Sequence, residues 1–237
     1  MFPLKDDVPS RSLPLVTVAI VLANLVAFAY QVSLQLGPDP GALAAVQDFV
    51  AEFGAVPCRL TGACAAPAEA PHPAVTVMTS MFLHGGLFHV GGNMLYLWIF
   101  GDNVEDTLGH GRFLLFYVLC GVAAAAAQTA ADPGSRVPMI GASGAVSGVL
   151  GAYLLLFPYA RILTLLMIGF FVRFVYVPAV VVLGFWIVVQ LVNGLLAMSA
   201  AAERGDTGGV AWFAHVGGFV AGMALLFVLR GRRGARL

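Results

Sequence analysis

Long apolar stretches without a charged side chain make up most of the chain. Asp, Glu, Lys and Arg are absent from residues 12–38, 70–101, 113–131, 137–160, 174–202 and 207–229. A helix needs about 20 apolar residues to cross the hydrocarbon core of a bilayer. The pattern therefore predicts an all-α membrane protein, a bundle of six transmembrane helices in one domain over residues 1–237.

A seventh apolar stretch, residues 162–172, is too short to cross a bilayer. Arg161 and Arg173 flank it. We expect an interfacial or partly buried connector here, with the fifth helix starting near Pro178. A seventh transmembrane helix is the alternative.

Prolines and glycines predict that the second and fourth helices start several residues after their apolar stretches begin. His84-Gly85-Gly86 predicts that the second helix starts near Leu87 and that the residues before it lie along the outer interface. Pro138 and Gly141 postpone the fourth helix to about Ser143. Because Pro158 ends that helix, it covers only about 22 Å of the roughly 30 Å core. The loop before Ser143 is therefore expected to re-enter the membrane from outside, which requires protein or a water-filled cavity around it.

Composition and charge agree with this class. Hydrophobic residues make up 60% of the chain and charged residues only 10%, against about a quarter in soluble domains. A cytosolic enzyme and a disordered chain are thereby excluded. The formal net charge is zero, so no nucleic-acid partner is expected.

The distribution of Lys and Arg predicts that both termini are cytoplasmic. With the N-terminus inside, the inner segments hold Lys5, Arg11, Arg112, Arg161, Arg173, Arg230, Arg232, Arg233 and Arg236. The outer segments hold only Arg59, Arg136 and Arg204.

Polar side chains inside the spans gather at one depth. His89 and Asn93 share one helix face at spacing i, i+4, Ser143 opens the fourth helix, and His215 is expected about two turns into the sixth. All four fall in the outer half of the bilayer under the predicted topology. Single amides elsewhere in spans are ordinarily interhelical hydrogen bonds, and this is the reading we favour for Asn24, Gln128, Gln190 and Asn193.

These residue types favour acyl transfer. A serine hydroxyl needs a base to accept its proton, and histidine has a suitable pKa. Amide, imidazole and helix N-terminal N–H groups stabilise an oxyanion. No Asp or Glu lies within any span, so a Ser–His dyad is predicted. Gly141 and Gly144 allow a tight turn around Ser143, although Gly144, Gly148 and Gly151 are equally typical of a helix-packing face.

Taken together, these motifs resemble the rhomboid family of intramembrane serine proteases. The matching pieces are Gly141-Ala142-Ser143-Gly144, Ala214-His215 with Gly218 and Gly222, His89-x-x-x-Asn93, and Phe100-Gly101-Asp102-Asn103-Val104-Glu105-Asp106. They cover a core of about 75–229, preceded by helix one and a long outer loop.

The resemblance implies a role for each matching residue. Ser143 would be the nucleophile and His215 the general base, and His89, Asn93 and the Ser143 N–H would form the oxyanion hole. Gly141, Gly144, Gly218 and Gly222 would allow close helix packing at the site. Ser147 stands where some members carry a tyrosine that stacks on the histidine, so another group must orient His215.

The implied function is cleavage of single-pass transmembrane proteins near the outer membrane boundary, with membrane lipid as the other partner. No cofactor or metal is expected, and the composition suggests a bacterial inner membrane. A catalytically inactive relative that binds transmembrane helices is the alternative. A transporter or channel is disfavoured, because the spans lack charged residues.

Two features outside the matching motifs leave alternatives open. Cys58 and Cys64 lie close together in the first outer loop, and a disulfide and two free thiols are both compatible with that spacing. His84 is read as a cap of the interfacial stretch rather than as a catalytic residue.

Overall fold

The computed structural model describes residues 2–36, 42–67, 70–169, 171–204 and 209–230. In chain order the elements are β1 (Phe2–Lys5), α1 (Leu15–Gln35), α2 (Ala42–Phe53), α3 (Pro57–Leu60), α4 (Pro73–Thr79), the 3₁₀ turn η1 (Ser80–Phe82), α5 (Leu87–Leu108), α6 (His110–Ala131), α7 (Ser143–Leu156), β2 (Arg161–Ile168), β3 (Phe171–Pro178), α8 (Ala179–Arg204) and α9 (Trp212–Leu229). Arg232, Arg233 and Arg236 of the predicted inner face lie outside the described residues.

Within these ranges, four helices are long and apolar enough to cross a membrane. They are α1, α6, α9 and the Ala179–Ser199 part of α8. Pro73–Phe82 and Leu87–Leu108 add a fifth span if they are counted as one, with a bend of 84° between them. α7 is apolar but shorter, with 14 residues. The chain is thus a mostly helical membrane protein.

Two helix starts predicted from glycine and proline positions are confirmed. α5 begins at Leu87, directly after Gly86, whose φ of +149° is favourable only for glycine. α7 begins at Ser143 and ends at Leu156, two residues before Pro158. α4 and η1 precede α5 at the bend, in the stretch expected to lie along the interface.

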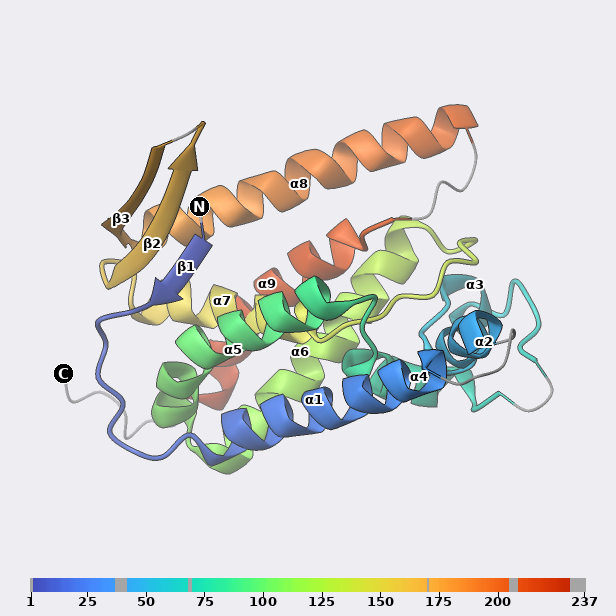
Figure 1. Ribbon diagram of the computed structural model, residues 1–237, viewed down its shortest axis with the longest axis horizontal. Coiled ribbons are helices and arrows are strands. Elements are labelled where there is room, and N and C mark those ends of the chain that lie inside the picture. The colour runs from blue at the N-terminus through green and yellow to red at the C-terminus, as the bar shows by residue number, and fades with distance from the viewer. Residues whose placement is uncertain (1, 37–41, 68–69, 170, 205–208, 231–237) are drawn as a thin grey trace.

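α7 occupies the centre of the bundle and α8 its edge. Every residue of α7 from 144 to 153 is buried, and the helix contacts α5, α6 and α9. α8 packs mainly on α9 and only weakly on α7. In Figure 1, α8 runs along one side of the bundle, away from α1 and α6.

The all-α assignment is wrong for the connector before α8. β2 and β3 form an antiparallel hairpin from Arg161↔Pro178 to Ile168↔Phe171, with Gly169 in its turn at φ +58°. β1 pairs antiparallel with β2 and completes a three-stranded sheet. Apolar residues on both faces of the hairpin give no alternation of period two, which is the usual signature of a strand. The third strand comes from the distant N-terminus, which no local pattern reveals.

The segment after β1 is held against the bundle by hydrogen bonds. Tyr153 donates from its hydroxyl to Asp6 Oδ2 over 2.6 Å, and the Arg161 N–H donates to Asp7 Oδ1 over 2.8 Å. Farther on, buried Glu105 accepts from the backbone N–H groups of Val16 and Thr17. The sheet and the start of α1 are thereby tied to α5 and α7.

Candidate active site

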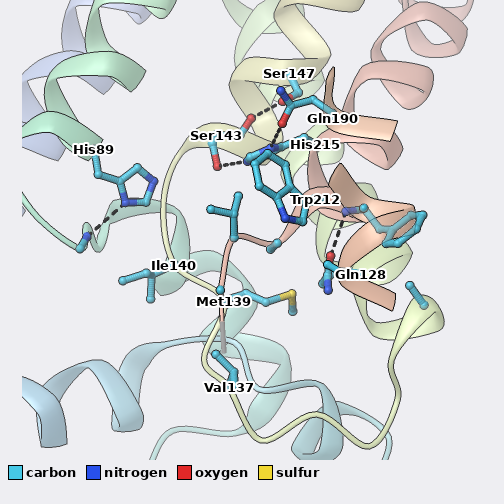
Figure 2. Close-up of a pocket in the computed structure, with 18 of the residues that line it drawn as sticks. His89, Gln128, Val137, Met139, Ile140, Ser143, Ser147, Gln190, Trp212 and His215 are labelled. Carbon is cyan, nitrogen blue, oxygen red and sulfur yellow. Dashed lines mark hydrogen bonds between the residues drawn. The ribbon is translucent and has the colours of Figure 1, made fainter. Parts of the chain in front are cut away.

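The structure brings Ser143 and His215 into direct contact. Ser143 is the first residue of α7, and its Oγ lies 2.8 Å from His215 Nε2 (Figure 2). His215 lies in the first turn of α9, because that helix begins only at Trp212. The expected depth of two turns is therefore wrong. Both side chains stand at the same ends of their helices, where hydroxyl and imidazole meet.

Glycines allow this contact by letting α7 and α9 approach backbone to backbone. A Cβ on Gly218 would overlap the carbonyl oxygen of Gly144, and one on Gly222 would overlap that of Gly148. Gly144 meets Ala124 of α6 in the same way, with 2.5 Å from an added Cβ to the alanine Cβ. Real Cβ atoms do not approach this closely, so the helices hold His215 beside Ser143 only while these positions lack side chains.

Gln190 of α8 makes the second hydrogen bond to His215. Its Oε1 lies 2.8 Å from His215 Nδ1, and its Nε2 donates to the carbonyl of Trp186 one turn earlier over 3.2 Å. Because an amide oxygen only accepts, Nδ1 carries the proton and Nε2 keeps its lone pair toward Ser143. The sequence interpretation treated Gln190 as one of several interhelical amides and missed this contact.

Two tryptophans complete the surroundings of the imidazole. The rings of Trp186 and Trp212 have centroids 6.0 Å and 6.2 Å from that of His215. Ser147 turns away and donates to the Ser143 carbonyl over 2.6 Å. Gln190 and the tryptophans are thus the groups that surround His215 where a tyrosine is missing.

Gln128 fixes the start of α9 from the neighbouring helix. Its Oε1 accepts from the backbone N–H of Phe213 over 3.0 Å and of Ala214 over 3.2 Å. These are N–H groups that a helix leaves without an internal acceptor, and Ala211 offers no side-chain cap. Gln128 therefore bonds between helices, as expected of an interhelical amide, whereas Asn24 and Asn193 bond to carbonyls of their own helices.

His89 and Asn93 converge on Gly141, two residues before Ser143. A Cβ on Gly141 would lie 2.7 Å from His89 Nε2 and 3.5 Å from Asn93 Nδ2, and Gly141 has φ +116°. His89 Nδ1 accepts from the Gly85 N–H over 3.2 Å, which leaves the proton on Nε2. Asn93 Nδ2 is buried and makes no hydrogen bond within the described chain. Two N–H donors thus lie against Gly141, and both residues line the same cavity as Ser143.

The loop that leads to Ser143 is supported along its length. Met139 exchanges backbone hydrogen bonds with Ala55, and the Gly141 N–H donates to the Ser80 carbonyl over 2.9 Å. The Ala142 N–H donates to His84 Nε2 over 3.5 Å. His84 is itself held by Gln31, which bonds both its N–H and its carbonyl. His84 therefore supports the loop that positions the serine.

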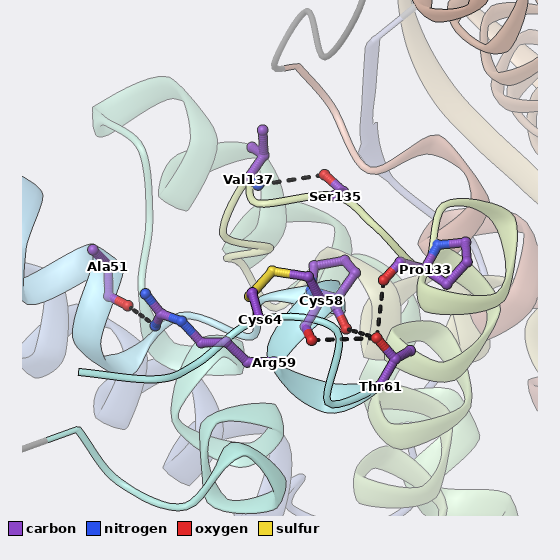
Figure 3. Close-up of a disulfide and its surroundings, with 9 residues drawn as sticks. Ala51, Cys58, Arg59, Thr61, Cys64, Pro133, Ser135 and Val137 are labelled. Carbon is purple, nitrogen blue, oxygen red and sulfur yellow. Dashed lines mark hydrogen bonds between the residues drawn. A yellow bond between two sulfur atoms is a disulfide. The ribbon is translucent and has the colours of Figure 1, made fainter. Parts of the chain in front are cut away.

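A turn closed by a disulfide contacts the same loop. Cys58 and Cys64 are joined, and they close the turn that contains α3 (Figure 3). The Cys58 N–H donates to the Ser135 carbonyl over 3.0 Å, and Thr61 Oγ1 donates to the Pro133 carbonyl over 3.0 Å. Of the two alternatives left open by the sequence, the structure contains the disulfide.

A cavity of about 1130 Å³ opens beside the serine. Its lining includes Ser143, His215, His89, Asn93 and Gln190, together with apolar groups from α5, α7 and α8 such as Tyr96, Leu150 and Met198. Among the described residues, no group of three or more His, Cys, Asp or Glu side chains is placed to hold a metal ion. The arrangement places a hydroxyl, an imidazole and N–H donors on the wall of one largely apolar cavity.

Comparison with known proteins agrees with this architecture. The chain matches the family model described as Rhomboid domain over residues 71–232. It is 35% identical over 161 residues to the Rhomboid protease GluP of Bacillus subtilis (strain 168), covering 68% of this chain and 28% of that protein. It is 37% identical over 93 residues to Rhomboid protein 1, mitochondrial, of Saccharomyces cerevisiae, covering 38% and 27%.

A plant relative matches over more of the chain. RHOMBOID-like protein 1 of Arabidopsis thaliana is 28% identical over 229 residues, covering 91% of this chain and 53% of that protein. The chain thus spans between 27% and 53% of the length of these three relatives. It belongs to the rhomboid family of integral membrane proteins, which includes intramembrane serine proteases.

Proposed function

We propose that the protein is an intramembrane serine endopeptidase that uses Ser143 as nucleophile and His215 as general base. The observation that carries this proposal is the 2.8 Å contact between Ser143 Oγ and His215 Nε2. Serine is a weak nucleophile until a positioned base takes its proton. The Nδ1 contact with Gln190 supports the tautomer in which Nε2 is that base.

The reaction follows the usual course of acyl transfer. Ser143 Oγ bonds to the carbonyl carbon of the substrate while its proton moves to His215 Nε2. Asn93 Nδ2, His89 Nε2 and the Ser143 N–H stabilise the oxyanion, as preorganised donors do. His215 then gives the proton to the leaving amide nitrogen, and the peptide C–N bond breaks. Water repeats the sequence on the acyl-enzyme and restores the serine.

The proposed arrangement in the membrane has six helices, with α7 the fourth and the loop before it re-entrant from outside. Both termini are then cytoplasmic, and Ser143 lies in the outer half of the bilayer. A substrate helix hides its carbonyls in internal hydrogen bonds, so it must unwind locally before attack. We therefore propose single-pass transmembrane proteins as substrates, cut near the outer boundary, and a bacterial inner membrane as the location.

Covalent labelling tests the proposal. Purified protein in detergent is treated with a fluorescent fluorophosphonate, and the label is expected on Ser143 of the wild type but not on Ser143→Ala or His215→Ala. Reconstituted wild type should also cut a single-pass substrate near its outer boundary, as mapped by mass spectrometry. An unlabelled, correctly folded wild type that still binds transmembrane helices would indicate a catalytically inactive family member instead.

A further inference from the structure

We infer that Gln190, which lies on α8, is a positioning residue that acts as the third member of a Ser–His–Gln system. Its kinetic consequence rests on the proposed protease function, whereas its structural consequence, the tautomer of His215, does not. The inference starts from the orientation of one buried amide.

The Gln190 amide has only one orientation that uses both of its ends. Its side chain is buried, with 6% exposure, and its Nε2 donates to the Trp186 carbonyl over 3.2 Å. That bond turns Oε1 toward His215 Nδ1, 2.8 Å away. The opposite rotation would set the amide oxygen against the Trp186 carbonyl, with no proton between the two acceptors. The helix backbone therefore selects the acceptor end for His215.

This orientation has two effects on His215. It keeps the proton on Nδ1, so Nε2 is free to accept from Ser143, and it holds the ring in the plane that makes this bond. When Nε2 takes the serine proton, the imidazolium still has an acceptor at Nδ1. A neutral amide stabilises the imidazolium less than a carboxylate does. However, no Asp or Glu lies within any of the six predicted transmembrane segments, so no carboxylate from these segments is available for this role.

The position of Gln190 links His215 to the helix at the edge of the bundle. α8 also carries Trp186 and Met198 to the wall of the cavity. α7 and α9 approach through glycines, but Gln190 reaches His215 only while α8 lies against α9. Displacement of the middle of α8 would take the acceptor from Nδ1 and widen the cavity in one movement. His215 is therefore oriented for catalysis only when α8 is in place.

The chain provides a matched control one turn further along α8. Asn193 also donates from its amide to the carbonyl four residues earlier, that of Val189, over 3.0 Å. It does not line the cavity. Gln190→Leu and Asn193→Leu therefore remove the same kind of own-helix hydrogen bond, but only the first removes an acceptor from His215.

The first measurement is turnover of a reconstituted substrate. Gln190→Leu is expected to lower kcat about 10- to 100-fold, the effect of one hydrogen bond to a charged group, with little change in KM. Asn193→Leu should match the wild type. Gln190→Glu keeps an acceptor at the same reach and should recover most of the lost rate. Equal rates for Gln190→Leu and Asn193→Leu, with the wild type active, would overturn the inference but not the protease assignment.

The second measurement needs no turnover. Nitrogen NMR of protein labelled at its five histidines, with His215 assigned from a His215→Ala spectrum, reports which ring nitrogen is protonated. The expected wild-type state is Nδ1–H with unprotonated Nε2, and Gln190→Leu should give a mixture of tautomers. A wild-type His215 protonated on Nε2 would overturn the inference even if Gln190→Leu fails to fold.

Discussion

α7 and α9 meet through their backbones, whereas α8 approaches the same bundle through side chains. Between α7 and α9, a Cβ on Gly151, Gly218 or Gly222 would fall within 2.2 Å of a backbone carbonyl oxygen of the facing helix. On α8, a Cβ at Gly184 would meet nothing within 4 Å, and large residues such as Phe185 and Leu195 are exposed to the surroundings of the bundle. Both helix groups line one cavity, but only the first has its separation set by backbone contact.

The residues of the site therefore lie on two kinds of helix, one held by backbone contacts and one held by side chains. Ser143 and His215 stand on the helices whose distance cannot change without breaking glycine contacts. Gln190 and Trp186 stand on the helix that few contacts hold. Reacting atoms require placement within a fraction of an ångström, while a cavity that admits a substrate chain must be able to widen. Under the proposed protease function, α7 and α9 would serve the first requirement and α8 the second.

The largest expected effect comes from adding a methyl group to α9, and the same change on α8 serves as its control. Gly222→Ala would drive its Cβ into the Gly148 carbonyl oxygen, so α7 and α9 must separate. We expect a loss of about 3 kcal/mol or more in the free energy of unfolding and no fluorophosphonate labelling. Gly184→Ala on α8 should be neutral or should stabilise the helix by up to about 1 kcal/mol. Thermal unfolding in micelles measures both, and equal effects would contradict the comparison.

The next prediction compares two variants on different sides of the cavity, one expected to change kcat and the other KM. Asn93→Ala removes a buried donor from the α5 side and is expected to lower kcat about 10²–10³-fold. Met198→Ala on the α8 side lines the cavity with a half-exposed side chain and should change mainly KM. Steady-state kinetics on one reconstituted substrate tests both variants. Full turnover by Asn93→Ala with several substrates would remove Asn93 from the proposed oxyanion hole.

The sequence predicted best those features that local chemistry determines. Charged residues bound the spans, Gly86 sets the start of α5 and Pro158 follows the end of α7, because each acts on its own few residues. The sequence also predicted that Ser143, His215, His89 and Asn93 lie near one another, and in the structure they line one cavity. Their catalytic roles remain predictions.

Features that depend on distant partners escaped the sequence interpretation. The start of α9 has no local cap and is fixed by Gln128 of α6, which is why His215 was placed a turn too deep. β2 and β3 lack alternation, and β1, which pairs with β2, lies far away at the N-terminus. In the sequence, Gln190 and Asn193 are both amides within the same apolar stretch. Only the packing of the helices distinguishes Gln190 as the residue that contacts His215.

The disulfide allows a smaller test of the fixed side of the cavity. Cys58 and Cys64 close the turn that supports the loop before Ser143 through Ser135 and Pro133. Replacing both cysteines by serine is expected to lower the free energy of unfolding by about 2 kcal/mol and to slow fluorophosphonate labelling several-fold. A reductant should have the same effect on the wild type and none on the double variant. A wild type whose labelling rate is indifferent to reductant would show that the turn is held by its hydrogen bonds alone.

The smallest effect concerns the C-terminal part of α7, to which Asp6 ties the sheet that precedes α8. Burial raises the pKa of the Asp6 carboxyl to about 6, although its hydrogen bond from Tyr153 opposes the rise. The folded state therefore favours protonated Asp6, so this group's contribution to stability is fully present below about pH 4 and is lost as pH rises to about 6.

Asp6→Asn removes this charge and keeps an oxygen that accepts from Tyr153. We expect the variant to be more stable than the wild type at pH 7.5, by less than about 1 kcal/mol because solvent screens the group, and equal to it at pH 4. Asp7→Asn is the control, since Asp7 is exposed and accepts only from the Arg161 N–H in the described part of the chain. Thermal unfolding across this pH range measures the difference. A variant less stable at pH 7.5 would mean that the charged carboxylate itself holds β1 against α7. The sheet that precedes α8 would then be anchored by charge rather than by a neutral hydrogen bond.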